Sequence, residues 1–185
     1  GVVENKVFAQ RVVDWTKAAV ENNLTVVIMV EEIEQGKMLD EMLWTETGKI
    51  FIPHQFIHGN ETPEVRDKAL RDFGAGELPV LIISRIGDEG IDLQNIHVLL
   101  LAGSRKSKIR TLQRLGRGLR GDRLIVVEFA NYCHKYLIKH SLERLQDYKR
   151  EECFPIHQFK DGTDKTAMIK RLWDAQDKVN ETRMK

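Results

Sequence analysis

The sequence predicts an α/β fold in which a mostly parallel central sheet is covered by helices on both faces. Three observations indicate this class. Short apolar runs such as VVIMV recur along the chain, segments with helical periodicity alternate with them, and no internal repeat or low-complexity segment interrupts the alternation. At 185 residues the chain has the usual size of one domain and is long enough to bury a sizeable core.

The amino-terminal part of the chain is expected to begin with a helix. Four apolar residues recur there at helical spacing: Phe8, Val12, Trp15 and Ala19. The pair Asn22-Asn23 breaks this pattern. Residues 24–30 (LTVVIMV) then predict a strand that is covered on both faces, residues 31–43 predict a helix, and residues 55–59 (QFIHG) predict a second strand that ends in a glycine turn.

The middle of the chain predicts one helix and three further strands. Thr62 and Pro63 supply a cap and a first-turn proline for a helix through Phe73, and Gly74 is expected to end it. The strands are apolar runs at the following positions: 79–84, 96–103 and 123–129.

Two helices are expected after the last strand. The first covers residues 131–148 and carries one stripe: Leu137, Ser141, Arg144 and Tyr148. The second begins near Thr163 and carries another: Met168, Leu172, Ala175 and Val179. We expect residues 153–185 to form a helical extension packed on residues 1–152, with Trp173 on its flank, acting as a structural cap or as a partner-binding appendage.

Composition excludes some classes of function. The formal net charge is +1, so bulk electrostatics indicate no polyanion partner. Cys133 and Cys153 are expected to be free thiols in a reducing compartment; a metal pair of Cys133 with His134 is the alternative, and no metal site is expected. The longest purely apolar run is far too short to span a bilayer and no secretory signal is visible, so we expect a soluble, intracellular protein without a membrane partner. The chain begins with Gly1, which suggests a missing neighbouring segment.

Residues 84–93 (SRIGDEGIDL) follow a predicted strand and combine a hydroxyl group with two glycines and three acids. In parallel sheets ligands bind the loops at the carboxyl ends of the strands. Glycines let a backbone approach a ligand closely, and a carboxylate can accept hydrogen bonds from ribose hydroxyls. The alternative is an ordinary loop in which Gly87 and Gly90 permit positive φ. The dinucleotide fingerprint G-x-G-x-x-G is absent from the whole chain.

Positive charge is concentrated between residues 105 and 123, where Asp122 is the only acid. The basic residues of this segment are Arg105, Lys106, Lys108, Arg110, Arg114, Arg117, Arg120 and Arg123. On a helix, two stripes lie about 130° apart. One consists of Leu112, Leu115 and Leu119, and the other of Gln113, Arg117 and Arg120.

Three interpretations of this basic segment remain open. It is a solvated helix face, a patch that binds nucleic-acid phosphates, or a pair of arginines that stabilise a phosphoryl group during its transfer. Gly116 and Gly118 are unexpected on a solvated helix, since each costs roughly 1 kcal/mol in a helix interior. The third interpretation requires a nucleotide site elsewhere.

Together the two segments resemble motifs of superfamily 2 helicases. SRIGDEGIDL resembles motif V, and QRLGRGLR (113–120) resembles motif VI, in the right order and with one strand between them, as in the second RecA-like domain of these proteins. VVIMVEEIEQGKML resembles motif IV with its helix, and residues 56–84 resemble the stretch that leads into motif V. The resemblance covers residues 1–152. KSKIRTLQRLGRGLR is particularly similar to the phage UvsW-type helicases of DNA repair and recombination.

This resemblance implies a RecA-like three-layer sandwich and an ATP site shared with a preceding domain. Arg117 and Arg120 match the arginine fingers that reach the γ-phosphate, and we expect them to face solvent when that domain is absent. Gln113 matches the motif VI residue that organises the interface. Gly90 and Asp92 match the motif V positions that approach the ribose of the nucleotide.

The resemblance also implies a nucleic-acid track. Ser84 matches the hydroxyl residue that touches the phosphate backbone, and four further residues are expected on the same rim: Arg85, Gly59, Arg105 and Lys106. Glu89 stands where DEAD-box RNA helicases have arginine, which favours the DNA-translocating branches. The implied partner is therefore DNA, as a single strand or a branched duplex.

The chain lacks two motifs that such a motor needs, the Walker A loop and the acidic magnesium motif. Residues 45–50 (TETGKI) contain Gly48-Lys49 but neither the earlier glycine nor the following hydroxyl. The resemblance therefore implies the carboxyl-terminal half of an ATP-dependent DNA helicase. The other half would be the N-terminal RecA-like domain of the same protein, and it would hold most of the ATP and Mg²⁺. The fragment alone is expected to be a monomer that does not hydrolyse ATP, from the cytoplasm of a bacterial or phage-infected cell.

Two other classes of function stay open. The first is a non-catalytic nucleic-acid or protein-binding module that kept the fold and lost the motor. The second, a small-molecule nucleotide enzyme of Rossmann type, is disfavoured because the glycine fingerprint is missing.

Overall fold

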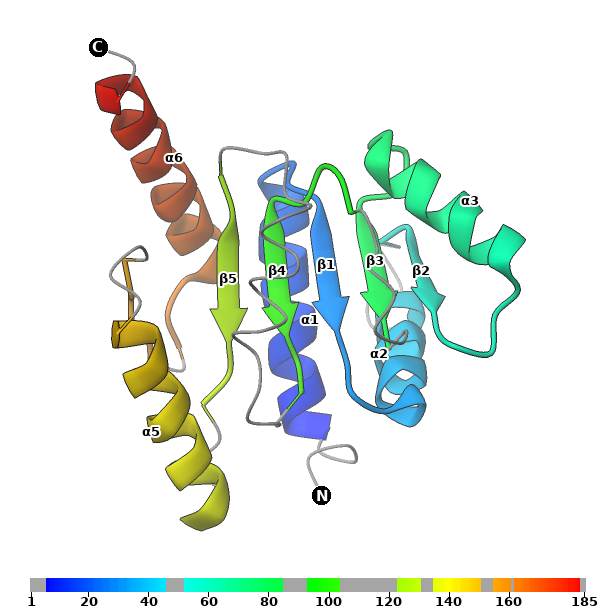
Figure 1. Ribbon diagram of the computed structural model, residues 1–185, viewed down its shortest axis with the longest axis horizontal. Helices are drawn as coiled ribbons and strands as arrows, with labels where there is room; N and C mark the ends of the chain where they lie inside the picture. Colours follow the sequence, from blue (N-terminus) through cyan, green and yellow to red (C-terminus); the bar gives the residue numbers. More distant parts are fainter. Residues whose placement is uncertain are drawn as a thin grey trace.

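A computed structural model describes residues 6–45, 52–84, 93–103, 123–130, 135–150, 155–160 and 162–183. Within these ranges five strands form one parallel sheet with the order β2-β3-β1-β4-β5 (Figure 1). The strands are β1 (Val26–Met29), β2 (His54–Ile57), β3 (Val80–Ile83), β4 (Val98–Leu101) and β5 (Ile125–Glu128). Each of them lies inside or within one residue of a run predicted from the sequence.

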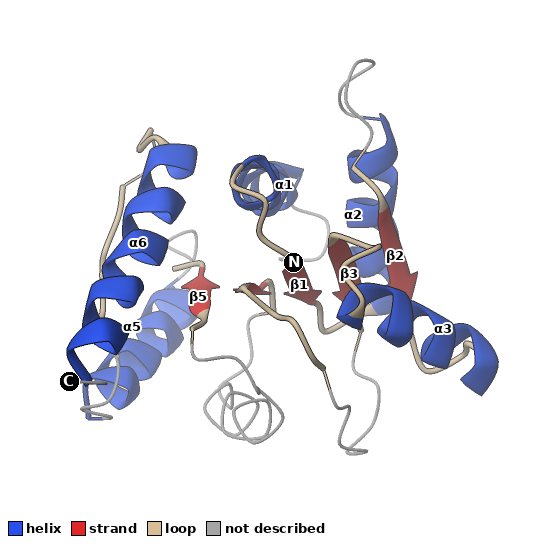
Figure 2. Cartoon of the chain, turned by 90° about the horizontal axis from the view of Figure 1, so that it is seen from above, coloured by secondary structure: helices blue, strands red, loops and turns tan. Residues whose placement is uncertain are grey.

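Helices cover both faces of this sheet. The described helices are α1 (Lys6–Glu21), α2 (Ile33–Thr45), α3 (Pro63–Gly74), α5 (Lys135–Arg150) and α6 (Lys165–Arg183). Seen from above, α1 and α2 lie on one side of the sheet and α3 lies on the other (Figure 2). The predicted α/β class, a three-layer sandwich with a parallel central sheet and helices after it, is confirmed.

The strands divide the core between the two faces by simple alternation. Val26 and Ile28 of β1 point to the face covered by α1 and α2, whereas Val27 points to the face covered by α3. Residues of both sets are almost completely buried, so the central strands have no solvated face. This explains why their sequences are continuous apolar runs instead of alternating ones.

The start of α3 is as predicted and its end is one residue later. The Thr62 hydroxyl accepts a hydrogen bond from the Val65 N–H at 3.4 Å, and Pro63 occupies the first turn. Gly74 does not stop the helix but is its last residue. The positive φ expected at the stop occurs at Gly76, where it is +79°, because Ala75 still donates its N–H to the Arg71 carbonyl at 2.9 Å.

The carboxyl-terminal helix α6 packs on α1. The Asn22 side chain donates to the Thr166 carbonyl at 3.0 Å, and the Thr166 hydroxyl donates to Glu21 at 2.8 Å. The buried face of α6 differs from the predicted stripe by one position. It is formed by Ile169, Leu172, Trp173 and Gln176, whereas Ala175 is exposed.

The rotation of the α6 face has a physical reason. Ile169 and Trp173 together have a larger apolar surface than Met168 and Ala175. Burying Ile169 and Trp173 therefore removes more apolar area from water, and these two residues decide which side of the largely polar helix α6 faces the core. The side chain of Val179 lies outside the described residues. Among the helices of the described part of the chain, none is long and apolar enough to cross a membrane.

Candidate functional site at the carboxyl edge of the sheet

All five strands end at the same level. Ile57 pairs with Ile83, Ile83 and Leu101 each pair with Met29, and Leu101 pairs with Glu128. The residues that follow the strands therefore share one edge, which we call the carboxyl rim: Val30, His58, Ser84, Ala102 and Phe129. In Figure 1 this is the edge at which all the arrowheads point. Ligands of open parallel sheets bind at this edge.

Two of the predicted site residues lie in the described part of the chain, and both are at the carboxyl rim. Ser84 follows β3 directly, its N–H donates to the Ile57 carbonyl at 3.1 Å, and its exposed fraction is 3%. Gly59 is exposed in the turn after β2, and a Cβ added there would meet nothing within 4 Å. The backbone at Gly59 is therefore open to an approaching ligand.

The other predicted residues lie outside the described residues. They are Arg85, Gly90, Asp92, Arg105, Lys106, Gln113, Arg117 and Arg120. Cys133, His134, Cys153 and Glu89 also lie outside them. The described structure does fix where the segments that carry these residues leave the sheet. Residues 85–92 follow Ser84 and residues 104–122 follow Gly103, so both begin at the carboxyl rim.

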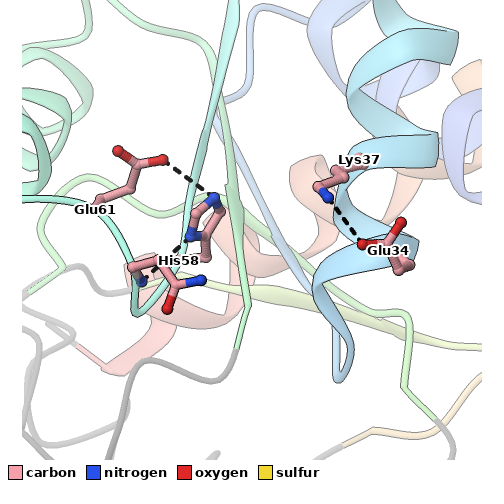
Figure 3. A network of polar contacts seen from close by, with 5 residues as sticks. Glu34, Lys37, His58 and Glu61 are labelled. Carbon is pink, nitrogen blue, oxygen red and sulfur yellow. Dashed lines mark hydrogen bonds and ion pairs between the residues drawn. The ribbon is translucent and has the colours of Figure 1, made fainter.

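A histidine holds the turn that contains Gly59. The Asn60 N–H donates to Nδ1 of His58 at 3.3 Å, and Nε2 of His58 lies 3.1 Å from Oε1 of Glu61 (Figure 3). Because Nδ1 accepts a hydrogen bond, the proton of a neutral imidazole is on Nε2, where it is donated to Glu61. Together with the hydrogen bond from the Glu61 N–H to the His58 carbonyl at 3.0 Å, these contacts hold the turn after β2. The ring of Phe56 packs on His58 with 5.0 Å between the centroids.

The first turn of α2 borders the same rim. Lys37 pairs with Glu34 at 2.8 Å across three residues, and both side chains are largely exposed (Figure 3). An exposed pair of this kind contributes at most about 1 kcal/mol and leaves both groups accessible. Figure 3 shows this pair and the His58–Glu61 pair in one close view.

The end of β5 is tied to α5 by a buried charged cluster. Arg144, whose exposed fraction is 6%, forms an ion pair with Glu128 through Nε and donates to the Ser141 hydroxyl at 3.2 Å. Burial, and then the negative charge of Glu128, raise the pKa of Tyr148. The predicted stripe Ser141–Arg144–Tyr148 is therefore a polar stripe that faces Glu128. The side chain of Leu137 lies outside the described residues.

Arg123 belongs to the opposite edge of the sheet. Its guanidinium lies 4.4 Å above the centre of the Trp173 ring, at the start of β5. Although Arg123 is the last residue of the basic segment, its charge faces an aromatic ring of α6. The sequence alone draws attention to Trp173 but does not reveal this partner.

Gln35 is a buried residue of the rim that the sequence did not lead us to expect. It lies in the first turn of α2 with an exposed fraction of 4%, and its side-chain amide donates to the Ala102 carbonyl at 2.8 Å. The only signal in the sequence was a glutamine beside a glycine, Gly36, at the start of an amphipathic helix, and such a glutamine ordinarily faces water.

The architecture and the rim define a class, the α/β domains that bind a ligand at the carboxyl ends of parallel strands. Comparison with known proteins narrows this class to one family. Residues 9–122 match the helicase conserved C-terminal domain, and the chain belongs to this family of superfamily 2 helicase domains. This result confirms the resemblance inferred from motifs IV, V and VI.

Individual relatives include helicases named for DNA and for RNA. The chain is 30% identical over 148 residues to the ATP-dependent DNA helicase uvsW of Enterobacteria phage T4, covering 68% of this chain and 28% of that protein. It is 38% identical over 104 residues to the Rad25 protein of Haloarcula marismortui, covering 54% of this chain and 15% of that one. The chain thus spans less than a third of the length of these relatives.

Solved structures agree on the fold. The crystal structure of T4 UvsW matches with a TM-score of 0.59 at 24% identity, over 82% of this chain and 33% of that chain. Dbp5 of S. cerevisiae, solved bound to RNA and ADP BeF3, matches with a TM-score of 0.67 at 18% identity, over 91% of this chain and 42% of that chain. The fold is therefore that of a RecA-like helicase C-terminal domain.

Proposed function

We propose that the chain is the carboxyl-terminal half of an ATP-dependent DNA helicase or translocase that acts in DNA repair, recombination or replication-fork processing. The observation that carries this proposal is the shared carboxyl rim. Residues 84–93, which resemble motif V, begin there, and so do residues 104–122, which contain the motif VI resemblance at 113–120. The two segments start at the ends of β3 and β4, the strands on either side of β1, and are therefore suited to act on one nucleotide and one nucleic-acid strand.

In this proposal residues 1–152 are the second RecA-like domain and residues 153–185 are a helical extension packed on it. The contacts of α6 with α1 support the extension as a structural cap. The domain pairs with an N-terminal RecA-like domain of the same protein. When ATP draws the two domains together, Arg117 and Arg120 approach the γ-phosphate, and Gln113 organises the interface.

ATP with Mg²⁺ supplies the phosphoryl group whose transfer to water drives the cycle. Among the described residues, no group of three or more His, Cys, Asp or Glu side chains could hold a metal. In the proposed arrangement the preceding domain holds most of the ATP and Mg²⁺. Gly90 and Asp92 are proposed to lie against the ribose, where glycine permits close approach and a carboxylate accepts hydrogen bonds.

The proposed nucleic-acid track runs along the carboxyl rim. Gly59 is open to a phosphate, and Arg85, Arg105 and Lys106 add positive charge. Ser84 is 3% exposed, so its hydroxyl reaches a phosphate only if the rim rearranges when the strand binds. Backbone contacts of this kind carry little base specificity. DNA is preferred over RNA because Glu89 departs from the DEAD-box arginine.

The finger assignment is tested with Arg120→Ala in the complete helicase polypeptide. We expect DNA-stimulated ATP turnover to fall roughly a thousandfold or more, while DNA affinity changes little, because the guanidinium acts on charge that develops during phosphoryl transfer. The matched control is Arg171→Ala, which removes an exposed arginine from α6. Equal losses of turnover and of DNA binding in Arg120→Ala would refute the assignment.

The track is tested with the double variant Arg105→Ala/Lys106→Ala. We expect weaker binding of single-stranded DNA and a salt slope that is flatter by about 0.7 for each phosphate that is no longer neutralised. The adjacent exposed pair Lys170 and Arg171 on α6, replaced in the same way, is the control and should leave the slope unchanged. An unchanged slope in the first variant removes those residues from the track. The same titrations with RNA test the preference for DNA.

The alternative candidate is a non-catalytic nucleic-acid or protein-binding module with the same fold. For such a module we expect Arg120→Ala to change only the binding of nucleic acid or protein, and we expect the complete polypeptide not to hydrolyse ATP. The retention of Gln113, Arg117 and Arg120 at the finger spacing argues against it, since a binding module needs no such spacing.

A further inference from the structure

The buried side-chain amide of Gln35 connects the ends of two adjacent strands, β1 and β4. Its Nε2 donates to the Ala102 carbonyl at 2.8 Å, and its Oε1 accepts from the Glu31 N–H at 3.4 Å. The Ala102 N–H donates to the Met29 carbonyl at 2.9 Å. Both backbone groups of Ala102 are therefore held by residues of β1 or α2, one residue past the end of β4.

Gly103 lies against the same structure. A Cβ added at Gly103 would be 2.5 Å from Cγ and 2.6 Å from Oε1 of Glu31, closer than such atoms can approach. A glycine at this position lets the chain leave β4 along the Glu31 side chain. The side chain of Glu31, just after β1, therefore lies against the backbone of Gly103, just after β4.

A second close contact sets the position of α2. A Cβ added at Gly36 would overlap the ring of Phe56 on β2. Because Gly36 has no side chain, the first turn of α2 can lie directly on the sheet. Only from there does the side chain of Gln35, the preceding residue, reach the Ala102 carbonyl.

These contacts end where the segment with the proposed fingers begins. Residue 104 follows Gly103, and residues 104–122 contain Gln113, Arg117 and Arg120. The hydrogen bonds of Ala102 fix the backbone from which this segment starts, and an error of about 1 Å in the position of a group that acts on a transition state can cost on the order of a hundredfold in rate.

We propose that Gln35 is a positioning residue for ATP hydrolysis: through the Ala102 carbonyl it fixes the point at which residues 104–122, the segment with the proposed fingers, leave the sheet. Gln35 touches neither nucleotide nor nucleic acid in this role. It acts through the Ala102 carbonyl. In this role, the placement of helix α2 on the sheet affects where Arg117 and Arg120 lie relative to the γ-phosphate.

The test replaces Gln35 by methionine in the complete helicase polypeptide. Methionine has a similar size but no group that can donate to the Ala102 carbonyl. We expect kcat for ATP to fall roughly ten- to a hundredfold, with KM for ATP and the affinity for DNA within about twofold of the unchanged protein. A role in folding alone would lower Tm without this split between kcat and KM.

The matched control is Thr25→Val, at the opposite edge of the sheet. The Thr25 hydroxyl donates to the Asn95 carbonyl and lies 3.1 Å from Nδ1 of His97, so this variant also removes side-chain hydrogen bonding between two loop ends at a buried residue. We expect Thr25→Val to lower Tm to a similar extent while kcat is retained. If both variants lower kcat equally, or if Gln35→Met leaves kcat unchanged, Gln35 is not a positioning residue.

A second test uses the close approach at Gly103. Gly103→Ala places a methyl group where the Glu31 side chain now lies, so either that side chain or the backbone after Ala102 must shift, and we expect kcat to fall severalfold. Glu31→Ala removes the atoms that the methyl group would meet, so the double variant should recover most of the turnover. Additive losses in the double variant would overturn the proposed contact. This test holds even if Gln35→Met fails to fold.

Because this role rests on the proposed function, Arg120→Ala is measured in the same series. If Arg120→Ala abolishes turnover and Gln35→Met does not affect it, only the positioning role is wrong. If Arg120→Ala has no effect on turnover, the proposed fingers are wrong, and the positioning role is overturned with them.

Discussion

The two edges of the central sheet are built differently. At and near the carboxyl rim, close approaches occur at glycines: Gly103 lies against the Glu31 side chain, and Gly36 in the first turn of α2 lies against the Phe56 ring of β2. At the amino-terminal edge the loops are filled by large side chains. There Trp173 of α6 packs edge-on against His97, with ring centroids 5.0 Å apart.

The amino-terminal edge is also closed by hydrogen bonds. The Thr25 N–H donates to Nδ1 of His97 at 3.1 Å, and the Gln176 side chain donates to the Leu124 carbonyl at 3.3 Å. Asn95 adopts positive φ of 62° in the turn that precedes His97, a conformation that asparagine tolerates better than most residues. One edge therefore anchors the helical extension, while the other leaves backbone and polar groups within reach of a ligand.

The largest expected effect concerns the buried Arg144–Glu128 pair at the carboxyl end of β5. Here the carboxyl rim is closed by a buried ion pair, unlike the rest of that rim in the described part of the chain. We expect Arg144→Met to lower the free energy of unfolding of the chain by about 3–5 kcal/mol, because it leaves the Glu128 carboxylate without its buried cation. Denaturant unfolding of the chain measures this loss.

Two controls accompany that measurement. Lys139→Met removes the cation of the exposed pair with Glu143, 3.9 Å apart, and should cost less than about 0.5 kcal/mol. Glu128→Gln added to Arg144→Met should restore part of the stability, because the unpaired charge is gone. A loss below about 1 kcal/mol in Arg144→Met would mean that α5 does not depend on this pair.

The next effect tests the anchor at the amino-terminal edge. Trp173→Ala removes the ring that packs on His97 and lies under Arg123, and we expect a loss of about 2 kcal/mol in the free energy of unfolding. This is below the range for a fully buried tryptophan because Trp173 is only partly buried. Trp44→Ala is the control, since Trp44 is 57% exposed. Equal losses in both variants would contradict the assignment of Trp173 as an anchor.

The elements that could be predicted from the sequence are those whose signal is local. Each central strand is buried on both faces, so a continuous apolar run such as residues 79–84 identifies it within one or two residues. Thr62-Pro63 identified the start of α3 for the same reason. The family was recognised from segments 84–93 and 113–120, and the family match confirms it.

The features that could not be predicted depend on residues far apart in the chain. Gln35 is buried because its amide meets the Ala102 carbonyl, 67 residues away. Arg144 was placed on a helical stripe, but its partner Glu128 comes from a strand. The helical period predicts a buried face of α6 that differs by one residue from the observed one. Packing against α1 and His97 determines which face is buried, and the helical period alone does not contain this information.

The smallest expected effect is a pH dependence at the amino-terminal edge. Burial lowers the pKa of His97, and the positive charge of Arg123 lowers it further. The folded protein therefore keeps His97 neutral at a pH where the unfolded chain, with a pKa of about 6.5, already binds a proton. The contribution of His97 to stability is present above about pH 6.5 and is lost as the pH falls through the window between the two pKa values.

Unfolding at about pH 7.5 and about pH 5.5, for the unchanged chain and for His97→Gln, measures this contribution. We expect the loss of stability on acidification to be smaller in His97→Gln, since glutamine cannot be protonated. His157→Gln is the control, because His157 is exposed and its replacement should leave the difference between the two pH values unchanged. Identical losses in the unchanged chain and in His97→Gln would show that the ring between Thr25 and Trp173 is protonated as easily as it is in water, and that this edge is not closed.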